Sequence, residues 1–221
     1  MKILVLFMDY LRHDYSKQTL RSIANAGYPF DMVTIDKKGI ASVINDGIDL
    51  CHLREYDALV TCANDIEMPD DWLKHMVDYT QSIENTGMCG MHCVESIEKI
   101  IEINGKSIHP TFTAFGNVLI PMKAIRMIGY FNEDYDPYGM QDGDYAYRLN
   151  KAGFINYYIP NLKQNHLGND VGNGTEYRKM KDDGLVLADE KWKKWCNYYE
   201  STGDLIFEDR YFLKKFLDGN H

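Results

Sequence analysis

Apolar residues form short runs along the first half of the chain, and each run precedes a stretch with apolar residues at helical spacing. The runs are rich in aliphatic side chains, many of them β-branched, which favours β-strands, and the intervening spacing is typical of amphipathic helices. Strands are predicted over residues 2–8, 30–36, 56–63 and 88–94. Helices are predicted over residues 14–27, 39–51 and 69–87.

This alternation predicts an α/β fold with a mostly parallel central sheet flanked by helices on both faces. In such sheets, ligands bind beyond the carboxyl ends of the strands. Asp9, Asp36 and Asp65 each lie at or just after the end of a predicted strand. We therefore expect one acidic site at this edge of the sheet.

The second half of the chain has a different pattern. Asn104-Gly105 within residues 98–109 is typical of a β-hairpin. Further strands are predicted over residues 112–121 and 155–160, and helices over residues 122–129, 143–153, 189–203 and 209–219. Four aromatic residues near the end lie at helical spacing and are expected to pack against the core: Trp192, Trp195, Tyr198 and Tyr199.

Composition and charge exclude some classes of protein. The chain has 24 Lys and Arg against 33 Asp and Glu, a net charge of −9, which disfavours nucleic acid as a partner because such binding depends on cations that neutralise phosphates. No apolar stretch approaches the roughly 20 residues of a transmembrane helix. We expect a cytoplasmic protein with no transmembrane segment, and peripheral attachment to a membrane stays open.

The five cysteines are odd in number and scattered, as is typical of reduced thiols rather than a disulfide framework. Cys89, His92 and Cys93 have no second Cys/His pair nearby to complete a tetrahedral zinc site. Buried thiols are the better interpretation of these residues.

The first candidate for chemistry is the segment 64–67, Asn-Asp-Ile-Glu, directly after a predicted strand. Carboxylates at a rigid strand end are suitable ligands for Mg²⁺ or Mn²⁺. Pro69 and the two aspartates after it are explained by the start of a helix. Asp65 lies before that helix, and capping does not explain it.

The second candidate is the start of the helix near residue 143. Asp144 is suited to cap this helix and to pair with Arg148 four residues later. That interpretation leaves Asp142 on a short exposed turn after Gln141. A carboxylate in such a position can take a proton from an acceptor hydroxyl.

The third candidate is the polar segment 165–179. His166 follows a predicted strand and is either a metal ligand in the acidic site or ordinary surface. The glycines and asparagines after it predict a mobile loop. Arg178 and Lys179 then provide cations that can close over a diphosphate and exclude water.

Residues 2–168 resemble the GT-A glycosyltransferases, in particular the large family 2 group. The resemblance is carried by "VTIDKKGIASVINDGI", by "YDALVTCANDIEMPDDWL" with its DxD-like segment, and most specifically by residues 116–154 of the segment "FGNVLIPMKAIRMIGYFNEDYDPYGMQDGDYAYRLNKAGF", which begins at Phe115. The sequence departs from the family pattern in two places: Asn64 replaces the leading acid of the DxD-like motif, and Gln141-Asp142 replaces a Glu-Asp pair.

The resemblance implies a Rossmann-like fold with a glycosyltransferase domain over residues 1–180. The helical patterns that follow predict a C-terminal helical extension over residues 181–221 packed on this domain. The domain would comprise a nucleotide-binding half, 1–92, and an acceptor-side half, 93–168. It also implies transfer of a sugar with inversion from a nucleotide-diphosphate sugar, here a UDP-sugar, to a hydroxyl of a glycan, lipid-linked or other acceptor.

The same resemblance implies residue roles. Asp65 and His166 would bind Mn²⁺ or Mg²⁺, and Asp142 would be the general base. Asp36 would contact the uridine or ribose of the nucleotide, with Asp9 beside it, and Asn64 would belong to the same nucleotide-binding site. Arg178 lies beyond the resemblance and is expected, from its charge, to contact the diphosphate. Three alternatives stay open: a retaining transferase of the same fold, a nucleotidyltransferase, and a non-catalytic nucleotide- or carbohydrate-binding protein. The segment "MDYLRHDYSK" lacks the glycine-rich loop usual in nucleotidyltransferases.

Overall fold

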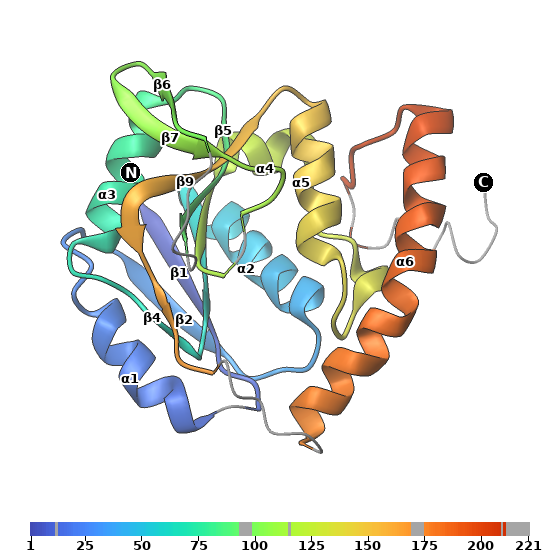
Figure 1. Cartoon of the computed structure of the whole chain (residues 1–221), viewed down its shortest axis with the longest axis horizontal. Coiled ribbons are helices and arrows are strands. Elements are labelled where there is room, and N and C mark those ends of the chain that lie inside the picture. The colour runs from blue at the N-terminus through green and yellow to red at the C-terminus, as the bar shows by residue number, and fades with distance from the viewer. Residues whose placement is uncertain (12, 93–98, 115, 169–174, 209, 211–221) are drawn as a thin grey trace.

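The computed structural model describes residues 1–11, 13–92, 99–114, 116–168, 175–208 and 210, and shows an α/β architecture with helices on both faces of one sheet (Figure 1). The strands are β1 (Ile3–Met8), β2 (Asp31–Ile35), β3 (Ala58–Ala63), β4 (Ile66–Glu67), β5 (Thr86–His92), β6 (Ile101–Ile103), β7 (Lys106–Pro110), β8 (Val118–Pro121), β9 (Ile155–Lys163) and β10 (Asn165–His166). The helices are α1 (His13–Ile23), α2 (Ile40–Arg54), α3 (Trp72–Ser82), α4 (Met122–Ile128), α5 (Gln141–Lys151) and α6 (Glu176–Thr202), with a 3-10 helix η1 (Glu133–Tyr135).

The central sheet has eight strands in the order β2-β1-β3-β8-β5-β9-β7-β6. β2, β1 and β3 are parallel, as are β5 and β9, whereas β8 is antiparallel to β3 and β5. β7 is antiparallel to β9 and to β6. Most strands therefore run in one direction with β8 and β7 reversed, which confirms the mostly parallel sheet.

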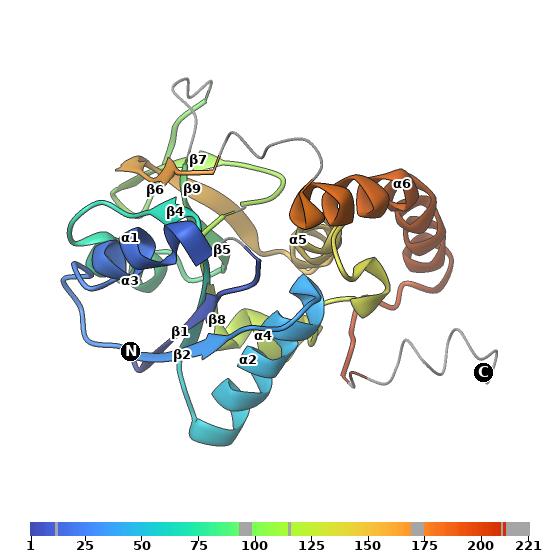
Figure 2. The same ribbon diagram turned by 90° about the horizontal axis from the view of Figure 1, so that it is seen from below.

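Both faces of the sheet are buried. Ile3, Val5 and Phe7 pack with α1 and α3, whereas Leu4 and Leu6 pack with α2, α4 and α5. Figure 2 shows these two sets of helices on opposite sides of the sheet. Because successive side chains of a strand point to opposite faces, burial on both sides explains the uninterrupted apolar run of β1.

The predicted hairpin is confirmed by β6 and β7. Asn104 and Gly105 join them with positive φ angles of 50° and 74°, as a two-residue turn of this kind requires.

The start of α3 differs from the prediction. The helix begins at Trp72 rather than at Pro69, because the residue before it, Asp71, adopts a left-handed conformation with φ 57°. The backbone N–H of Asp71 donates to the carbonyl of Asn25, and the Asn25 amide donates to Asp70. These aspartates therefore connect the chain to the end of α1, and the Asp71 side chain makes no capping hydrogen bond.

The C-terminal helix also differs from the prediction. α6 begins at Glu176, where the Thr175 side chain accepts from the backbone N–H of Arg178, and not at residue 189. The predicted boundary between residues 180 and 181 falls inside it, and the division of the chain there stays a prediction. The predicted helix over 209–219 lies, apart from Arg210, outside the described residues.

α6 lies outside α5, away from the sheet (Figure 2). Trp195 and Tyr199 pack with Tyr135 and Phe207 in an aromatic cluster of their own, which confirms the predicted packing role of these two residues. In the part of the chain that the structure describes, no helix has both the length and the apolar content needed to cross a membrane.

Candidate functional site

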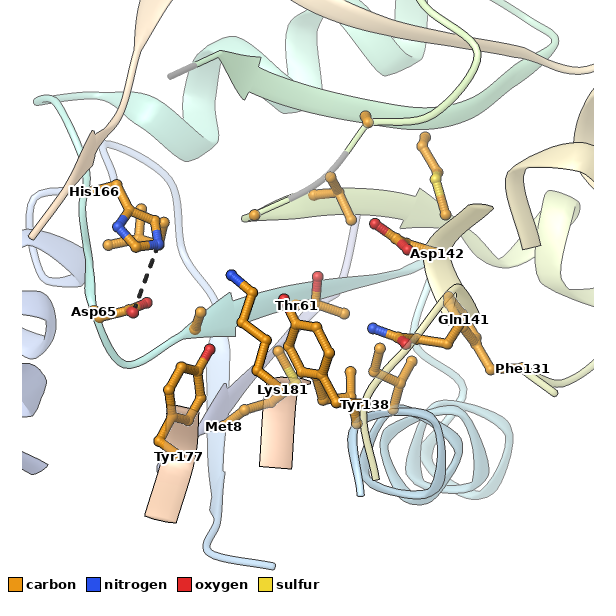
Figure 3. Close-up of a pocket in the computed structure, with 18 residues that line it drawn as sticks. Met8, Thr61, Asp65, Phe131, Tyr138, Gln141, Asp142, His166, Tyr177 and Lys181 are labelled. Atoms are coloured by element: carbon orange, nitrogen blue, oxygen red, sulfur yellow. Dashed lines mark ion pairs between the residues drawn. The ribbon is translucent and has the colours of Figure 1, made fainter. Parts of the chain in front are cut away.

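A pocket of about 430 Å³ lies beyond the carboxyl end of β3, between the start of α5 and α6. Asp65, Asp142 and His166 all line it, although they come from distant parts of the sequence. Figure 3 shows Asp65 and His166 at one end and Asp142 and Gln141 at the other. The structure thus brings together the proposed metal ligands and the proposed base.

Two short strands place His166 beside Asp65. β10 pairs antiparallel with β4, and this register puts His166 opposite Ile66, the residue after Asp65. The backbone N–H of Leu167 donates to the carbonyl of Asp65. As a result, His166 Nε2 lies 3.6 Å from Asp65 Oδ2.

The Asp65–His166 pair fits a divalent cation. His166 Nε2 faces the Asp65 carboxylate at 3.6 Å, and carboxylate with imidazole is a donor set that suits Mn²⁺. The described residues contain no group of three or more His, Cys, Asp or Glu side chains arranged around one metal position. Two protein ligands are sufficient where substrate phosphates provide the others.

Asn64 is directed toward Asp9. Its amide Nδ2 donates to Asp9 Oδ1 at 2.9 Å, and the same carboxylate oxygen accepts from Ser16 Oγ and lies 3.1 Å from His13 Nδ1. Burial raises the pKa of Asp9, but the hydrogen bonds from Ser16, Asn64 and His13 together lower that pKa below its usual value. Asp9 is therefore a fixed anion that orients Asn64, and it is not among the residues that line the pocket.

The predicted nucleotide contact Asp36 is exposed immediately after β2 and does not line the pocket. Its neighbour Lys37 lines a second, smaller cavity of about 80 Å³, together with Tyr10 and Asn64. This cavity adjoins the main pocket, since Asp65 and Tyr177 line both.

Asp142 lies in the first turn of α5 and is partly buried, whereas the sequence predicted an exposed turn. Its Oδ1 accepts from the backbone N–H of Gly143 at 2.9 Å. Burial raises the pKa of Asp142 and outweighs this hydrogen bond. A carboxylate with a raised pKa is a better proton acceptor than an ordinary aspartate.

Asp144, two residues later, has a structural role. It is fully buried, it pairs with Arg148 Nε at 2.9 Å, and it accepts a hydrogen bond from the Tyr199 hydroxyl at 2.6 Å. The predicted ion pair with Arg148 is confirmed, but Asp144 is not the N-cap, because α5 begins at Gln141 and Met140 is the N-cap residue. The two acids face different surroundings because each residue turns the helix by about 100°.

The pocket is also lined by Tyr138, Tyr177 and Lys181, which were not predicted from the sequence. Burial raises the pKa of the Tyr138 hydroxyl, and the charges of Asp142 and Asp65 add to this effect, so both carboxylates act on one phenol. Helical spacing in the sequence could have identified two of these residues, Tyr177 and Lys181. Tyr177 and Lys181 are four residues apart and share one face of α6, before residue 189, where the sequence predicted the terminal helix to begin.

Arg178 and Lys179 lie on α6 outside the pocket wall. Arg178 pairs with Asp182 at 3.0 Å and Lys179 with Asp183 at 2.8 Å, each one helical turn away. The contact of Arg178 with a diphosphate stays a prediction. The predicted mobile loop before α6 includes residues 169–174, which lie outside the described residues.

Sequence comparison does not identify a family: no family model matches the chain, and no curated protein matches it significantly. Comparison of structures does find proteins with a similar fold. The mannosyltransferase PcManGT of Pyrobaculum calidifontis, in complex with GDP-Man and Mn²⁺, superposes with a TM-score of 0.58 at 14% identity, over 77% of this chain and 58% of that protein's length.

Two further structures are similar. The catalytic domain of Drosophila β1,4-galactosyltransferase 7, in complex with xylobiose, has a TM-score of 0.53 at 13% identity over 81% of this chain and 79% of its own. Residues 1–349 of TarS from S. aureus, in complex with UDP, have a TM-score of 0.52 at 11% identity over 74% of this chain and 59% of their own. The chain therefore has the GT-A fold of nucleotide-sugar glycosyltransferases.

Proposed function

We propose that this protein is a glycosyltransferase that moves a sugar from a nucleotide-diphosphate sugar to an acceptor hydroxyl with inversion, using a divalent metal. The single observation that carries this proposal is the pocket itself: Asp65 and His166 line one end, and Asp142 lines the other. A donor whose diphosphate lies at the first end would present its sugar toward the second, where the acceptor enters.

Asp142 has the properties of the base. As the acceptor oxygen attacks the anomeric carbon, its proton passes to the Asp142 carboxylate. The bond from that carbon to the diphosphate oxygen breaks, and the electron pair leaves with the nucleoside diphosphate. Because attack and departure occur on opposite sides of the carbon, one displacement inverts it. Burial favours the protonated product form of Asp142.

Asp65 and His166 would hold the metal ion, and the ion would neutralise the charge that develops on the leaving diphosphate. Asp9 supports this end of the site indirectly, because it fixes the side chain of Asn64 next to Asp65. A net charge of −9 is compatible with such a donor, since the cation carries the phosphate contact.

The smaller cavity lined by Tyr10 and Lys37 is the proposed position of the nucleoside. A UDP-sugar is the proposed donor, and Mn²⁺ or Mg²⁺ the proposed metal. The TarS structure contains UDP, and the mannosyltransferase structure contains a GDP-sugar with Mn²⁺, which supports a nucleotide diphosphate in this fold. The proposed acceptor is a glycan, lipid-linked or other hydroxyl compound, and the proposed location is the cytoplasm or its membrane surface.

The test is a panel of UDP- and GDP-sugars with Mn²⁺, with thermal stabilisation and release of the nucleoside diphosphate as readouts. We expect at least one donor to stabilise the protein and to be hydrolysed slowly without acceptor. Addition of a chelator, or the variant D65A, should weaken binding of the nucleoside diphosphate sharply. Release of pyrophosphate from a nucleoside triphosphate would instead indicate a nucleotidyltransferase, and binding without turnover with any acceptor would indicate a binding protein.

A further inference from the structure

The C-terminal helix places one cation in the pocket. Lys181 lines the pocket, and its Nζ lies 5.6 Å from the centre of the Tyr138 ring. Figure 3 shows its side chain between the Asp65–His166 end and the Asp142 end. Among the described lining residues, Lys181 provides the one lysine or arginine side chain.

Two other cations on α6, Arg178 and Lys179, are paired with acidic side chains, whereas Lys181 has no acidic partner among the described residues. Arg178 and Lys179 form ion pairs with acids one turn further along the helix. The residue one turn beyond Lys181 is Leu185, so that no acid follows at the same spacing. Within the described part of the chain, no ion pair involves Lys181. Its charge is thus directed to the pocket rather than to its own helix.

The packing of α6 brings Lys181 close to the site. Gly184 lies against Tyr138, and a Cβ atom added at Gly184 would lie 2.1 Å from the Tyr138 carbonyl oxygen. Any larger residue would force the helix away from this loop. The absence of a side chain at Gly184 therefore allows the face with Tyr177 and Lys181 to form a wall of the pocket.

The end of the pocket that is lined by Asp65 and His166 carries less negative charge than a metal site with two carboxylates. Within the segment 64–67, Asn64 is engaged by Asp9, and Glu67 accepts hydrogen bonds from Gln18 and Asn165. Asp65 is the one carboxylate of this segment that lines the pocket. A cation bound through Asp65 and His166 alone would be held less firmly, and a second positive group would add directly to diphosphate binding.

We propose that Lys181 binds the donor diphosphate together with the metal, which makes the C-terminal helix a part of the active site. This inference rests on the proposed function, because it requires a nucleotide diphosphate in the pocket. It assigns to Lys181 the contact that the sequence analysis predicted for Arg178. It also implies that part of the affinity for the diphosphate survives removal of the metal.

The test is calorimetric titration of the full chain with UDP and with GDP, in Mn²⁺ and in a chelator, for wild type and four variants. K181M should weaken binding about ten- to hundredfold, as loss of a charge-assisted contact does, and should abolish the binding that remains in chelator. K181R should retain most of the affinity. K193M is the matched control, since Lys193 is exposed further along the same helix, and should leave binding unchanged.

The outcomes separate the two proposals. If wild type binds neither nucleotide with Mn²⁺, the proposed function fails and the inference fails with it. If wild type binds and K181M binds equally well, the inference alone is wrong. It is also wrong if R178M, and not K181M, loses affinity, because Arg178 would then be the diphosphate contact. Far-UV circular dichroism of each variant checks that the fold is intact.

Discussion

Two aspartates, one next to the pocket and one lining it, have pKa values that are shifted in opposite directions. Asp9, at the end of β1, receives hydrogen bonds from Ser16 and Asn64, and these interactions lower its pKa. Asp142, at the start of α5, accepts a hydrogen bond from the backbone N–H of Gly143, but burial outweighs it and raises the pKa of Asp142. The surroundings of Asp9 stabilise a permanent anion, whereas those of Asp142 prepare a proton acceptor.

The comparison shows that surroundings, and not residue type or position at a strand end, determine what a carboxylate can do. Asp144 extends this point. It lies two residues from Asp142 on the same helix, yet Arg148 and Tyr199 bind its carboxylate completely inside the protein. One turn of α5 therefore carries a catalytic candidate on one face and a structural ion pair on another.

The largest expected effect is on turnover. D142N should reduce kcat about 10²–10⁴-fold, because the acceptor hydroxyl loses its proton acceptor, while the affinity for the nucleoside diphosphate changes little. Single-turnover rates with the best donor and calorimetry on the same preparation measure both quantities. Full turnover in D142N would remove Asp142 from its role as base.

The next largest expected effect is on the free energy of unfolding, which should fall in D144N but not in D142N. D144N leaves Arg148 buried without its anion, so that the free energy of unfolding should fall by about 3–5 kcal/mol. D142N should leave that free energy unchanged or raise it slightly, because the buried ionised carboxylate destabilises the folded state at neutral pH. Urea unfolding of the two variants provides the comparison, and equal losses would contradict it.

A smaller effect is the pH dependence of activity. The base must be ionised, so kcat/KM should fall as the pH drops through the raised pKa of Asp142, about tenfold for each pH unit below it. This acid limb should lie above the ordinary aspartate value of 3.8. A limb at or below that value in kcat/KM would indicate that Asp142 is not the base.

The smallest effect concerns Asp9. D9A removes the acceptor of the Ser16 and Asn64 hydrogen bonds and should cost about 1 kcal/mol of stability. The lowered pKa of Asp9 fixes the pH window: its stabilisation is complete above the unfolded-state pKa near 3.8 and is lost as the pH falls through the lower folded-state value. The unfolding free energies of wild type and D9A should therefore differ at neutral pH and converge at acid pH, and a difference that is the same at both pH values would contradict this account.

Much of the fold could be predicted from local patterns. The uninterrupted apolar run of β1 and the turn at Asn104-Gly105 each depend on a few adjacent residues. The start of α6 was missed, because the glycine- and asparagine-rich stretch before Thr175 suggested a longer loop. The start of α3 was misplaced, because the conformation of Asp71 is set by its contact with Asn25, far away in the sequence.

The site could also be predicted only in part, because some of its residues follow from local patterns and others depend on long-range contacts. Asp65, Asp142 and His166 were found because they follow strands or begin a helix, and ends of strands meet at one edge of a sheet. Lys181 was not found, because its place in the pocket depends on tertiary packing of α6 against Tyr138 through Gly184. Asn64 was expected to contact the ligand, but its hydrogen bond to Asp9 is a long-range pairing that no local motif reveals.

The most direct test of the central claim, that Asp65, His166 and Asp142 surround one sugar-nucleotide pocket, is a crystal structure with Mn²⁺ and UDP, using anomalous scattering to locate the metal. We predict one Mn²⁺ peak within coordination distance of Asp65 and His166, with the diphosphate on the side that faces Asp142. A metal peak elsewhere, or a nucleotide bound on a surface remote from Asp142, would contradict the account.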